Sequence, residues 1–563
     1  MKRTFHLALA LSIAGCAFAG QVSTDFRVTN PFAQVTVVVQ FSSTPTAALF
    51  SLLAGNGAKT KKQFNHVPKV QVITVPASLV GLIAKIPGVK FVSPDRLVKK
   101  HLDLTAATVG STIANQYGWT GQGIGVAVID SGIDATNADL KQPGTGVNRV
   151  VYSEDFTGQG TTADLYGHGS HVAGIVGGNG ANSGGKYVGI APNVSLINLR
   201  VLDETGSGAD SSVIAAIDRA IELKSTYNIR VINLSLGRPI YESFSTDPLC
   251  QAVEAAYQAG IVVVVAAGND GRDNSANSMG YGTVGAPGND PFVITVGAMK
   301  TEGSANKSDD MVASYSAKGP TVVDHFVKPD VVAPGNIIAS LRAAGSTLDV
   351  GNPGNRVDPA LYGAPAGSTP MYFSMNGTSM ATPVVAGAAA LLLQQNPAMT
   401  PDQVKGRLMQ TASKSFPASS VAVDPVTGVS YPAYYDVFTI GAGYLDVMAA
   451  LNSTQMAPGT VPSPVAVFNT SNGTVSLVSP NQIAWGEQIA WGEQIAWGEQ
   501  IAWGESAIFG ASAVINGSSV AVLSSSAPVA QSTTGGFNAI WKSSASWATS
   551  VPSATSIPGK GEK

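Results

Sequence analysis

The stretch Val126-Ala-Val-Ile-Asp-Ser-Gly-Ile-Asp134 is the most informative part of this 563-residue chain. Its first four residues form an unbroken apolar run, which is typical of a strand buried on both faces of a parallel sheet. Such a strand would carry Asp130 at its carboxyl end, where open α/β sheets have their ligand sites. The segment therefore predicts an α/β fold with a polar site at one edge of the sheet.

Two more segments, far apart in the chain, carry a histidine and a serine. Gly167-His-Gly-Ser-His-Val-Ala-Gly174 contains His168, and Asn376-Gly-Thr-Ser-Met-Ala-Thr-Pro383 contains Ser379. A serine hydroxyl is a weak nucleophile at neutral pH and needs a base beside it. His168 would take the Ser379 proton and return it to the leaving group, while an ionised Asp130 would fix the imidazole tautomer. Each residue alone has a plain structural interpretation, but the three together predict nucleophilic catalysis.

Ser379 is predicted to lie in the first turn of a buried helix. An alanine-rich apolar stretch follows it from Val384 to Leu393. Pro383 is expected to be tolerated because the first helical turn has no amide partners to lose. A helix N-terminus favours negative charge that develops nearby, so this position suits a nucleophile.

The three contexts resemble the active-site segments of the subtilisin-like serine proteases, in that family's chain order of Asp, His and Ser. The resemblance extends from about Gly121 to about Leu451. It implies the doubly wound parallel α/β sheet of that family. It also implies a serine endopeptidase that acts on proteins and peptides, with Asp130, His168 and Ser379 as its catalytic triad.

The resemblance implies further site residues. Asn269, in Ala266-Ala-Gly-Asn-Asp270, would hold the oxyanion together with the backbone N–H of Ser379. Val231-Ile-Asn-Leu-Ser-Leu-Gly237 matches the strand that pairs with extended substrate. The two walls of the primary specificity pocket would be formed by Ser235, Leu236, Gly237, Ala266, Ala267 and Gly268. These residues carry no charge, so we expect a broad preference for apolar or neutral side chains before the scissile bond.

His171 and Cys250 are assigned structural roles. His171 lies three residues after His168, on roughly the same side of a helix, but the family pattern assigns catalysis to His168. The chain has two cysteines, and Cys16 falls in the predicted targeting segment. The catalytic region is therefore expected to have no internal disulfide, with Cys250 as a buried, small apolar residue.

Residues 1–19 have the pattern of a secretory signal peptide. Lys2 and Arg3 precede an apolar run, and Ala17-Phe-Ala19 is a small-residue cleavage site. An alternative stays open, because Ile13-Ala-Gly-Cys16 resembles the bacterial lipoprotein motif. We therefore expect secretion or, alternatively, a lipid anchor through Cys16.

Residues 20–104 have a separate pattern that alternates strands and helices. Strands are predicted at 35–41, 70–75 and 89–92, and helices at 46–53 and 77–85. The alternation resembles the small α+β, ferredoxin-like propeptide of subtilases. It implies a folding chaperone and intramolecular inhibitor, and we predict self-cleavage between about Val98 and Leu104. The catalytic domain would then span 105–452.

The composition changes after residue 452. Prolines indicate a linker at 453–481, four copies of Gln-Ile-Ala-Trp-Gly-Glu fill 482–505, and a Ser/Ala-rich, low-complexity tail occupies 506–563. The repeat is open to three interpretations: a β-forming segment for self-association or surface attachment, a short solenoid, or a segment with no fixed fold. We expect truncation after about Ser453 to leave peptidase activity intact.

The remaining expectations concern ions, partners and an alternative function. A net charge of −3 argues against an electrostatic nucleic-acid partner. Asp139 stands where many subtilisins carry a calcium carboxylate, but calcium needs six to eight oxygens. We therefore expect no required cofactor and leave Asp139 as a candidate calcium ligand. The alternative from a different class is a secreted binding or surface-attachment protein on a catalytically silent subtilase scaffold, and the intact triad argues against it.

Overall fold

The structure is a computed structural model that describes residues 21–22, 31–55, 57–63, 69–94, 103–275, 278–365, 367–417, 419–423, 428–469, 474–478, 514–515, 518–519, 553–554 and 562. The chain divides into two compact units, Met1–Lys99 and Lys100–Lys563, and each is described by itself. The predicted signal peptide, most of the predicted cleavage segment and the Trp-containing repeat lie outside the described residues.

The N-terminal unit is a five-stranded sheet with two helices. The strand order is β1-β5-β2-β4-β3. β2 buries Val37, Val39 and Phe41, while Val38 and Gln40 between them are partly or fully exposed, which is the two-residue period of a half-buried strand. The elements are β1 (Gln21–Val22), β2 (Gln34–Phe41), α1 (Ala47–Gly55), β3 (Lys59–Gln63), β4 (Val70–Pro76), α2 (Val80–Ala84) and β5 (Val89–Pro94).

Two strands of this unit, β1 and β3, were not predicted. β3 has the sequence Lys59-Thr-Lys-Lys-Gln63, which has no apolar alternation. It lies at the edge of the sheet, paired only with β4 among the described strands. Lysines are common on edge strands because they discourage pairing with other chains.

The second unit is built on an eight-stranded sheet in the order β13-β12-β11-β9-β6-β8-β7, with β14 also paired to β12. Every pairing in it is parallel except that of β12 with β13. The strands are β6 (Gly125–Asp130), β7 (Val150–Asp155), β8 (Ser195–Arg200), β9 (Ile229–Leu234), β11 (Val262–Ala266), β12 (Ile294–Lys300), β13 (Met311–Val312) and β14 (Val331–Pro334). The predicted parallel α/β sheet is confirmed.

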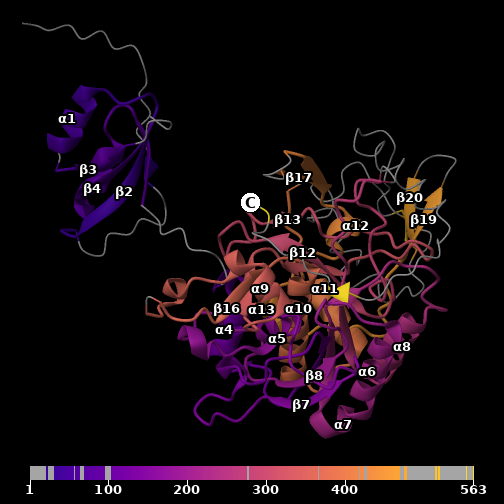
Figure 1. Ribbon diagram of the computed structural model, residues 1–563. Helices are drawn as coiled ribbons and strands as arrows, with labels where there is room; N and C mark the ends of the chain where they lie inside the picture. Colours follow the sequence, from indigo (N-terminus) through magenta and orange to yellow (C-terminus); the bar gives the residue numbers. More distant parts are fainter. Residues whose placement is uncertain are drawn as a thin grey trace, which may run out of the picture. The chain divides into compact units, whose positions relative to one another are not determined.

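Helices cover both faces of this sheet (Figure 1). β6 is buried along its whole length, and its side chains alternate between two cores. Val126 and Val128 belong to the larger core, with α5 and α10, whereas Ala127 and Ile129 belong to the smaller one, with α6 and α8. The main helices are α5 (His168–Gly177), α6 (Asp210–Glu222), α8 (Pro248–Gln258), α10 (Thr378–Gln395) and α11 (Pro401–Thr411).

Shorter elements complete the second unit. The helices are α3 (Asp103–Thr108), α4 (Ser111–Gln116), α7 (Lys224–Tyr227), α9 (Thr347–Gly351), α12 (Val437–Ile440) and α13 (Val447–Asn452). The strands are β10 (Leu236–Gly237), β15 (Ile338–Leu341), β16 (Tyr372–Met375), β17 (Ser419–Val423), β18 (Ser430–Tyr434), β19 (Val465–Asn469), β20 (Thr474–Val478), β21 (Val514–Ile515), β22 (Ser518–Ser519) and β23 (Ser553–Ala554).

The segment predicted as a linker packs on the second unit instead of leaving it. Val461 and Ala466 are buried in its larger core. The Ser463 hydroxyl donates to the buried Asp330 carboxylate at 2.7 Å and accepts from Lys405 Nζ at 3.0 Å. Truncation after Ser453 would remove these contacts, so a cut beyond β20 is the better design for a tail-free enzyme.

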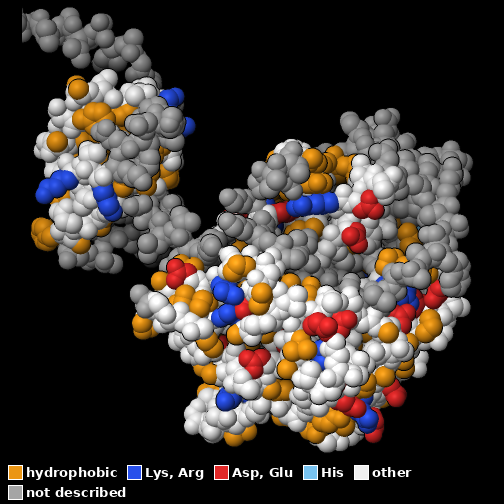
Figure 2. All heavy atoms as spheres, in the orientation of Figure 1, with side chains coloured by type: hydrophobic (Ala, Val, Ile, Leu, Met, Phe, Trp, Pro, Cys, Tyr) orange, Lys and Arg blue, Asp and Glu red, His pale blue; other side chains and the backbone are white. Residues whose placement is uncertain are grey.

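The surface has an ordinary charge distribution on the face that Figure 2 shows. Acidic and basic side chains are scattered there among uncharged ones. Within the part of the chain that the structure describes, no helix has the length and apolarity needed to cross a membrane.

Candidate active site

Asp130 is the last residue of β6, between β8 and β9. Its carboxylate is buried, and Oδ1 accepts the backbone N–H of Ser131 at 2.7 Å. The sheet therefore delivers this side chain at its carboxyl edge, as the apolar run before it predicts.

His168 is the first residue of α5 and lies against Asp130. Its Nδ1 is 2.7 Å from Asp130 Oδ1, and both side chains are buried. A carboxylate only accepts hydrogen bonds, so Nδ1 carries the proton and Nε2 is the basic nitrogen of the neutral ring. Nε2 is buried and has no hydrogen-bond partner among the described residues. The geometry leaves one basic nitrogen free to accept a proton.

A glycine allows the histidine helix to approach the aspartate so closely. A Cβ on Gly169 would lie 2.2 Å from the carbonyl oxygen of Gly132 and 3.2 Å from Asp130 Cβ. No larger residue fits there without moving backbone. Gly169 is thus required by the contact between α5 and the loop after β6.

Asp164 joins the same two elements and was not predicted from the sequence. Its Oδ1 accepts from the Ser131 hydroxyl and from Gly167 N–H, both at 2.7 Å, and its Oδ2 accepts from Ser170 N–H at 2.7 Å. Burial raises the pKa of Asp164, and these donors oppose that effect. Asp164 is a positioning residue, and its only signal in the sequence is an acidic side chain just before a helix start.

Ser379 is the second residue of α10 and is fully buried. Gly377 precedes the helix with φ of 145°, a region that other residues avoid. The Ser379 hydroxyl donates to the carbonyl oxygen of Ser235 at 2.9 Å, so its bond to His168 Nε2 is not made in this structure. Catalytic hydrogen bonds are often incomplete without substrate.

Pro383 is tolerated for a different reason from the one we predicted. It is the sixth residue of α10, not part of the first turn, and its missing N–H would have bonded to the carbonyl of Ser379. That carbonyl instead accepts the Ser235 hydroxyl at 2.9 Å. The serine on the substrate strand thus replaces the hydrogen bond that the proline removes.

Asn269 lies beside the start of α10, and its side chain is held in one orientation. Its Oδ1 accepts the N–H of Thr378 at 2.9 Å and the Thr378 hydroxyl at 3.2 Å. With the amide oxygen engaged, the amide nitrogen is the end left to donate. The predicted oxyanion donor, Asn269, is therefore bonded through its amide oxygen to Thr378, the residue just before the predicted nucleophile Ser379.

The predicted pocket residues are brought to the same region. The Ser235 hydroxyl donates to the Ser379 carbonyl, and the Ser379 hydroxyl donates to the Ser235 carbonyl. Leu236 and Gly237 follow Ser235 as β10. On the other side, Gly268 N–H donates to the Thr378 hydroxyl at 3.2 Å. Ala266 ends β11, and Ala267 is buried with Val284 and Ala317. Ser235 and Gly268 bond to the start of α10, and the other four predicted wall residues are their neighbours in the chain.

The comparisons with known proteins agree with this arrangement. The sequence profile of the subtilase family matches residues 121–429. The chain belongs to the subtilase family. It is a serine-type endopeptidase, as the sequence predicted.

This subtilase aligns with most of the length of several individual relatives. Serine protease AprX of Bacillus subtilis (strain 168) is 39% identical over 365 residues, which are 63% of this chain and 77% of that protein. Subtilisin E of the same organism is 33% identical over 413 residues, covering 73% and 91%. The extracellular serine proteinase of Thermus sp. (strain Rt41A) is 32% identical over 368 residues, covering 63% and 74%.

We predict that Asn269→Ala lowers kcat of this subtilase by roughly 10²–10³, with little change in KM; that range was measured for the same kind of donor in subtilisin. The donor acts on charge that develops only in the transition state. Steady-state kinetics on a chromogenic peptide measures the change. Asn269→Asp is the matched variant, because it keeps the acceptor for Thr378 N–H but sets a negative charge at the oxyanion. A loss below threefold in both variants would exclude the assignment.

We predict that Ser235→Ala destabilises the enzyme by about 1–3 kcal/mol, because the Ser379 carbonyl then loses its donor in a buried position. Urea unfolding in a Ser379→Ala background avoids self-digestion. Ser225→Ala, on the exposed surface of α7, is the control, and it should change the free energy of unfolding by less than about 0.5 kcal/mol. Equal effects of the two substitutions would contradict the role given to Ser235.

His171 has the contacts of a structural histidine. Its Nε2 donates to the carbonyl oxygens of Ile338 and Phe373, at 3.0 and 2.9 Å. Burial, together with the neighbouring His168, lowers the pKa of His171 to about 3. The ring therefore stays neutral and ties α5 to β15 and β16.

Asp139 is surrounded by hydrogen-bond donors. Its carboxylate accepts from the Tyr372 hydroxyl at 2.6 Å and from Asn182 N–H at 2.7 Å. Burial raises its pKa. Among the described residues, no group of three or more His, Cys, Asp or Glu side chains could hold a metal ion. These donors compete with a cation for the same oxygens, and the expectation that no cofactor is required, with Asp139 only a candidate calcium ligand, stays a prediction.

Cys250 is buried on α8 and its thiol donates to Asn289 Oδ1 at 3.2 Å. Burial raises the pKa of this thiol well above its usual value. A thiol that does not ionise is a poor nucleophile, which agrees with the packing role expected for it.

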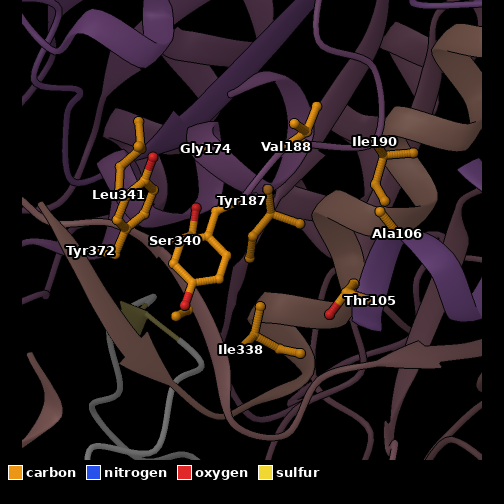
Figure 3. Close-up of a pocket in the computed structure, with 13 residues that line it drawn as sticks. Thr105, Ala106, Gly174, Tyr187, Val188, Ile190, Ile338, Ser340, Leu341 and Tyr372 are labelled. Atoms are coloured by element: carbon orange, nitrogen blue, oxygen red, sulfur yellow. The ribbon is translucent and has the colours of Figure 1, made fainter. Parts of the chain in front are cut away.

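A small cavity lies away from the triad, between α5 and the strands β15 and β16. Its volume is about 20 Å³, room for about one water molecule. Figure 3 shows Tyr187, Ile338 and Tyr372 among the side chains around it. None of Asp130, His168 and Ser379 lines it, so it is not the substrate site.

Proposed function

We propose that this subtilase hydrolyses peptide bonds with Ser379 as nucleophile and His168 as general base. Asp130 would orient the imidazole and stabilise the imidazolium that forms. The 2.7 Å contact between His168 Nδ1 and Asp130 Oδ1, with Nε2 buried and basic, carries the proposal. The position of Ser379 at the start of α10 supports it further.

The reaction follows from these groups. As Ser379 Oγ attacks the substrate carbonyl carbon, its proton passes to His168 Nε2, and Asp130 stabilises the resulting imidazolium. The carbonyl oxygen becomes an oxyanion, which accepts hydrogen bonds from Ser379 N–H and the Asn269 amide nitrogen. His168 then gives the proton to the leaving amine, and an acyl-enzyme forms. Water, deprotonated by the same nitrogen, releases the acyl group and restores Ser379.

Extended substrate would pair with β10 by main-chain hydrogen bonds. The side chain before the scissile bond would enter between the two uncharged walls, Ser235–Gly237 and Ala266–Gly268. A pocket without a charged partner disfavours a buried ionic side chain. The substrate class is therefore proteins with apolar or neutral residues at that position.

The N-terminal unit would serve as a propeptide that is removed by the enzyme itself. Its five-stranded fold has its own core, separate from that of the second unit. The signal-peptide pattern at 1–19 and the relative named as an extracellular proteinase support secretion. Attachment to a surface, through Cys16 or through the tail, is the alternative location.

The test is intact-mass analysis of wild type and Ser379→Ala, each with and without a fluorophosphonate probe. Wild type should lose about 80 residues beyond the signal peptide, following the predicted boundary, and gain one probe. Ser379→Ala should keep these residues and stay unlabelled. A folded wild type that is neither cut nor labelled would instead favour a binding protein on a silent scaffold.

A further inference from the structure

The strand proposed to bind substrate already has a partner from the same chain. β10 pairs antiparallel with β23, close to the C-terminus, with Leu236 opposite Ala554 and Gly237 opposite Ser553. The residue before β10 is Ser235, whose carbonyl accepts the Ser379 hydroxyl. Because the strands are antiparallel, β23 runs in the direction from Gly237 towards Ser235. The tail is therefore paired as a peptide whose C-terminal direction leads towards the nucleophile.

A second contact fixes the end of the same tail. Glu562 is buried, and its carboxylate accepts from Arg272 Nη2 at 2.6 Å and from Ser314 N–H at 3.0 Å, as well as from the Ser314 hydroxyl. Its backbone is held too: its N–H donates to Asn336 Oδ1 and its carbonyl accepts from Asn336 Nδ2, both at 3.0 Å. Figure 1 shows the C-terminal end beside β13, the strand just before Ser314.

The residues that hold Glu562 border the catalytic elements. Arg272 is three residues after Asn269 in the chain. Next to Asn336, Ile337 N–H donates to Asn376 Oδ1 at 2.6 Å, and Gly377 N–H donates to Gly335 O at 2.9 Å. The loop bonded to this site is thus the one that leads into α10 and Ser379.

These contacts form a built site for a carboxylate. Arg272 supplies the charge, Ser314 supplies one backbone and one hydroxyl donor, and the Arg272 Nε–H donates to the Ser314 Oγ at 2.7 Å, which fixes its orientation. The side-chain amide of Asn336 binds both the N–H and the carbonyl oxygen of the Glu562 backbone. The ligand that fits is an acidic residue within a peptide.

We propose that the C-terminal tail is an intramolecular ligand of the substrate groove, held at β10 by β23 and at the site Arg272–Ser314–Asn336 by Glu562. The proposal rests on the proposed function for the identity of β10 as the substrate strand. Peptide substrates must displace β23 to pair with β10. Tethering gives the tail a high effective concentration, so it competes even if each contact is weak. Competition of this kind raises the apparent KM and leaves kcat unchanged.

The first test compares full-length enzymes on a short, uncharged chromogenic peptide. Glu562→Gln removes the charge that Arg272 binds, and the double substitution Ser553→Pro/Ala554→Pro removes both backbone donors of β23, including the one that faces β10. Glu562→Gln should lower KM about tenfold, since losing one charge-assisted hydrogen bond weakens binding by roughly that factor. The proline variant loses a neutral backbone hydrogen bond and should lower KM by roughly threefold to tenfold, and kcat should stay within twofold in both. Glu505→Gln makes the same chemical change elsewhere in the tail, and its KM should equal that of wild type. Intact mass verifies that the tail is still attached.

The second test measures binding without turnover. A fluorescent peptide with the sequence of residues 553–563 is titrated into Ser379→Ala and into Ser379→Ala/Glu562→Gln, and anisotropy gives Kd. Both variants keep the complete C-terminal tail and are first freed of the N-terminal unit by tagged wild type, which is then withdrawn. The peptide should bind the double variant at least fivefold more tightly, because the resident tail has lost its anchor there. Equal affinities, or no binding at millimolar peptide, would overturn the proposal. If the peptide binds as expected but processed wild type hydrolyses no chromogenic peptide, the proposed function alone is contradicted.

Discussion

Replacing either His168 or Ser379 with alanine is expected to lower kcat by about 10⁶, and the double variant should lose no more than either single one; this size and this non-additivity are those measured in subtilisin. The reason lies in the shared proton. Without His168 Nε2 the Ser379 hydroxyl has no base to receive its proton, and without Ser379 the base has no nucleophile to activate. Once one of the two residues is gone, the other no longer contributes to catalysis, so replacing it as well does not lower kcat further.

The measurement needs enzymes that are free of the N-terminal unit, which inactive variants are not expected to remove themselves. A trace of affinity-tagged wild type can process them and then be withdrawn, and residual kcat is read against that background. His171→Asn is the matched control, since His171 is a second buried histidine on α5 that donates to Ile338 and Phe373. Its kcat per correctly folded molecule should stay within a few-fold of wild type. Retention of one per cent of kcat in His168→Ala would end its assignment as the base.

The sequence predicts the candidate site because the residues of that site lie in local patterns. The apolar run before Asp130 specifies a buried strand, and the small residues around His168 and Ser379 specify close approach of helix and loop. These requirements act over fewer than ten residues, so a single chain reveals them. The chain order of the three segments, Asp then His then Ser, additionally indicates the subtilase family.

What could not be predicted depends on contacts between distant segments. The bond from the Ser235 hydroxyl to the Ser379 carbonyl spans 144 positions, and it corrects our account of Pro383. The part that Asp164 plays is visible only once Ser131 and α5 are seen on either side of it. The tail is the extreme case, since β23 lies more than 300 positions from β10 in the numbering.

The predicted linker illustrates the same limit from the side of composition. Prolines and small polar residues after 452 have the composition of a connecting segment. Yet Ser463 joins a buried group of charges, with Asp330 and Lys405, that the segment helps to satisfy. Buried charges need hydrogen-bond partners, and these can come from a segment that is distant in the sequence. The polar composition of this segment therefore did not predict that Ser463 would be buried.

Asp130→Asn is expected to lower kcat by about 10⁴ with little change in KM, as found at the corresponding aspartate of other serine proteases. The shape of the site would be kept, but an amide can donate a hydrogen bond to His168 Nδ1, where the carboxylate can only accept one. The ring would then carry its proton on Nε2, the nitrogen that must take the proton from Ser379. The imidazolium formed later would also lose its countercharge, and both effects act on the transition state rather than on substrate binding.

The control for this change is Asp139→Asn, which alters a second buried aspartate in the same way. Asp139 accepts from Tyr372 and from Asn182 N–H and contacts none of the triad residues in these hydrogen bonds. An asparagine can keep an acceptor there, so kcat should stay within a few-fold while stability changes. The rate of fluorophosphonate labelling should fall with kcat in Asp130→Asn and not in Asp139→Asn, because labelling needs the same activated hydroxyl. If both variants label at the wild-type rate, the contact between His168 Nδ1 and Asp130 holds the fold together rather than setting the tautomer for catalysis.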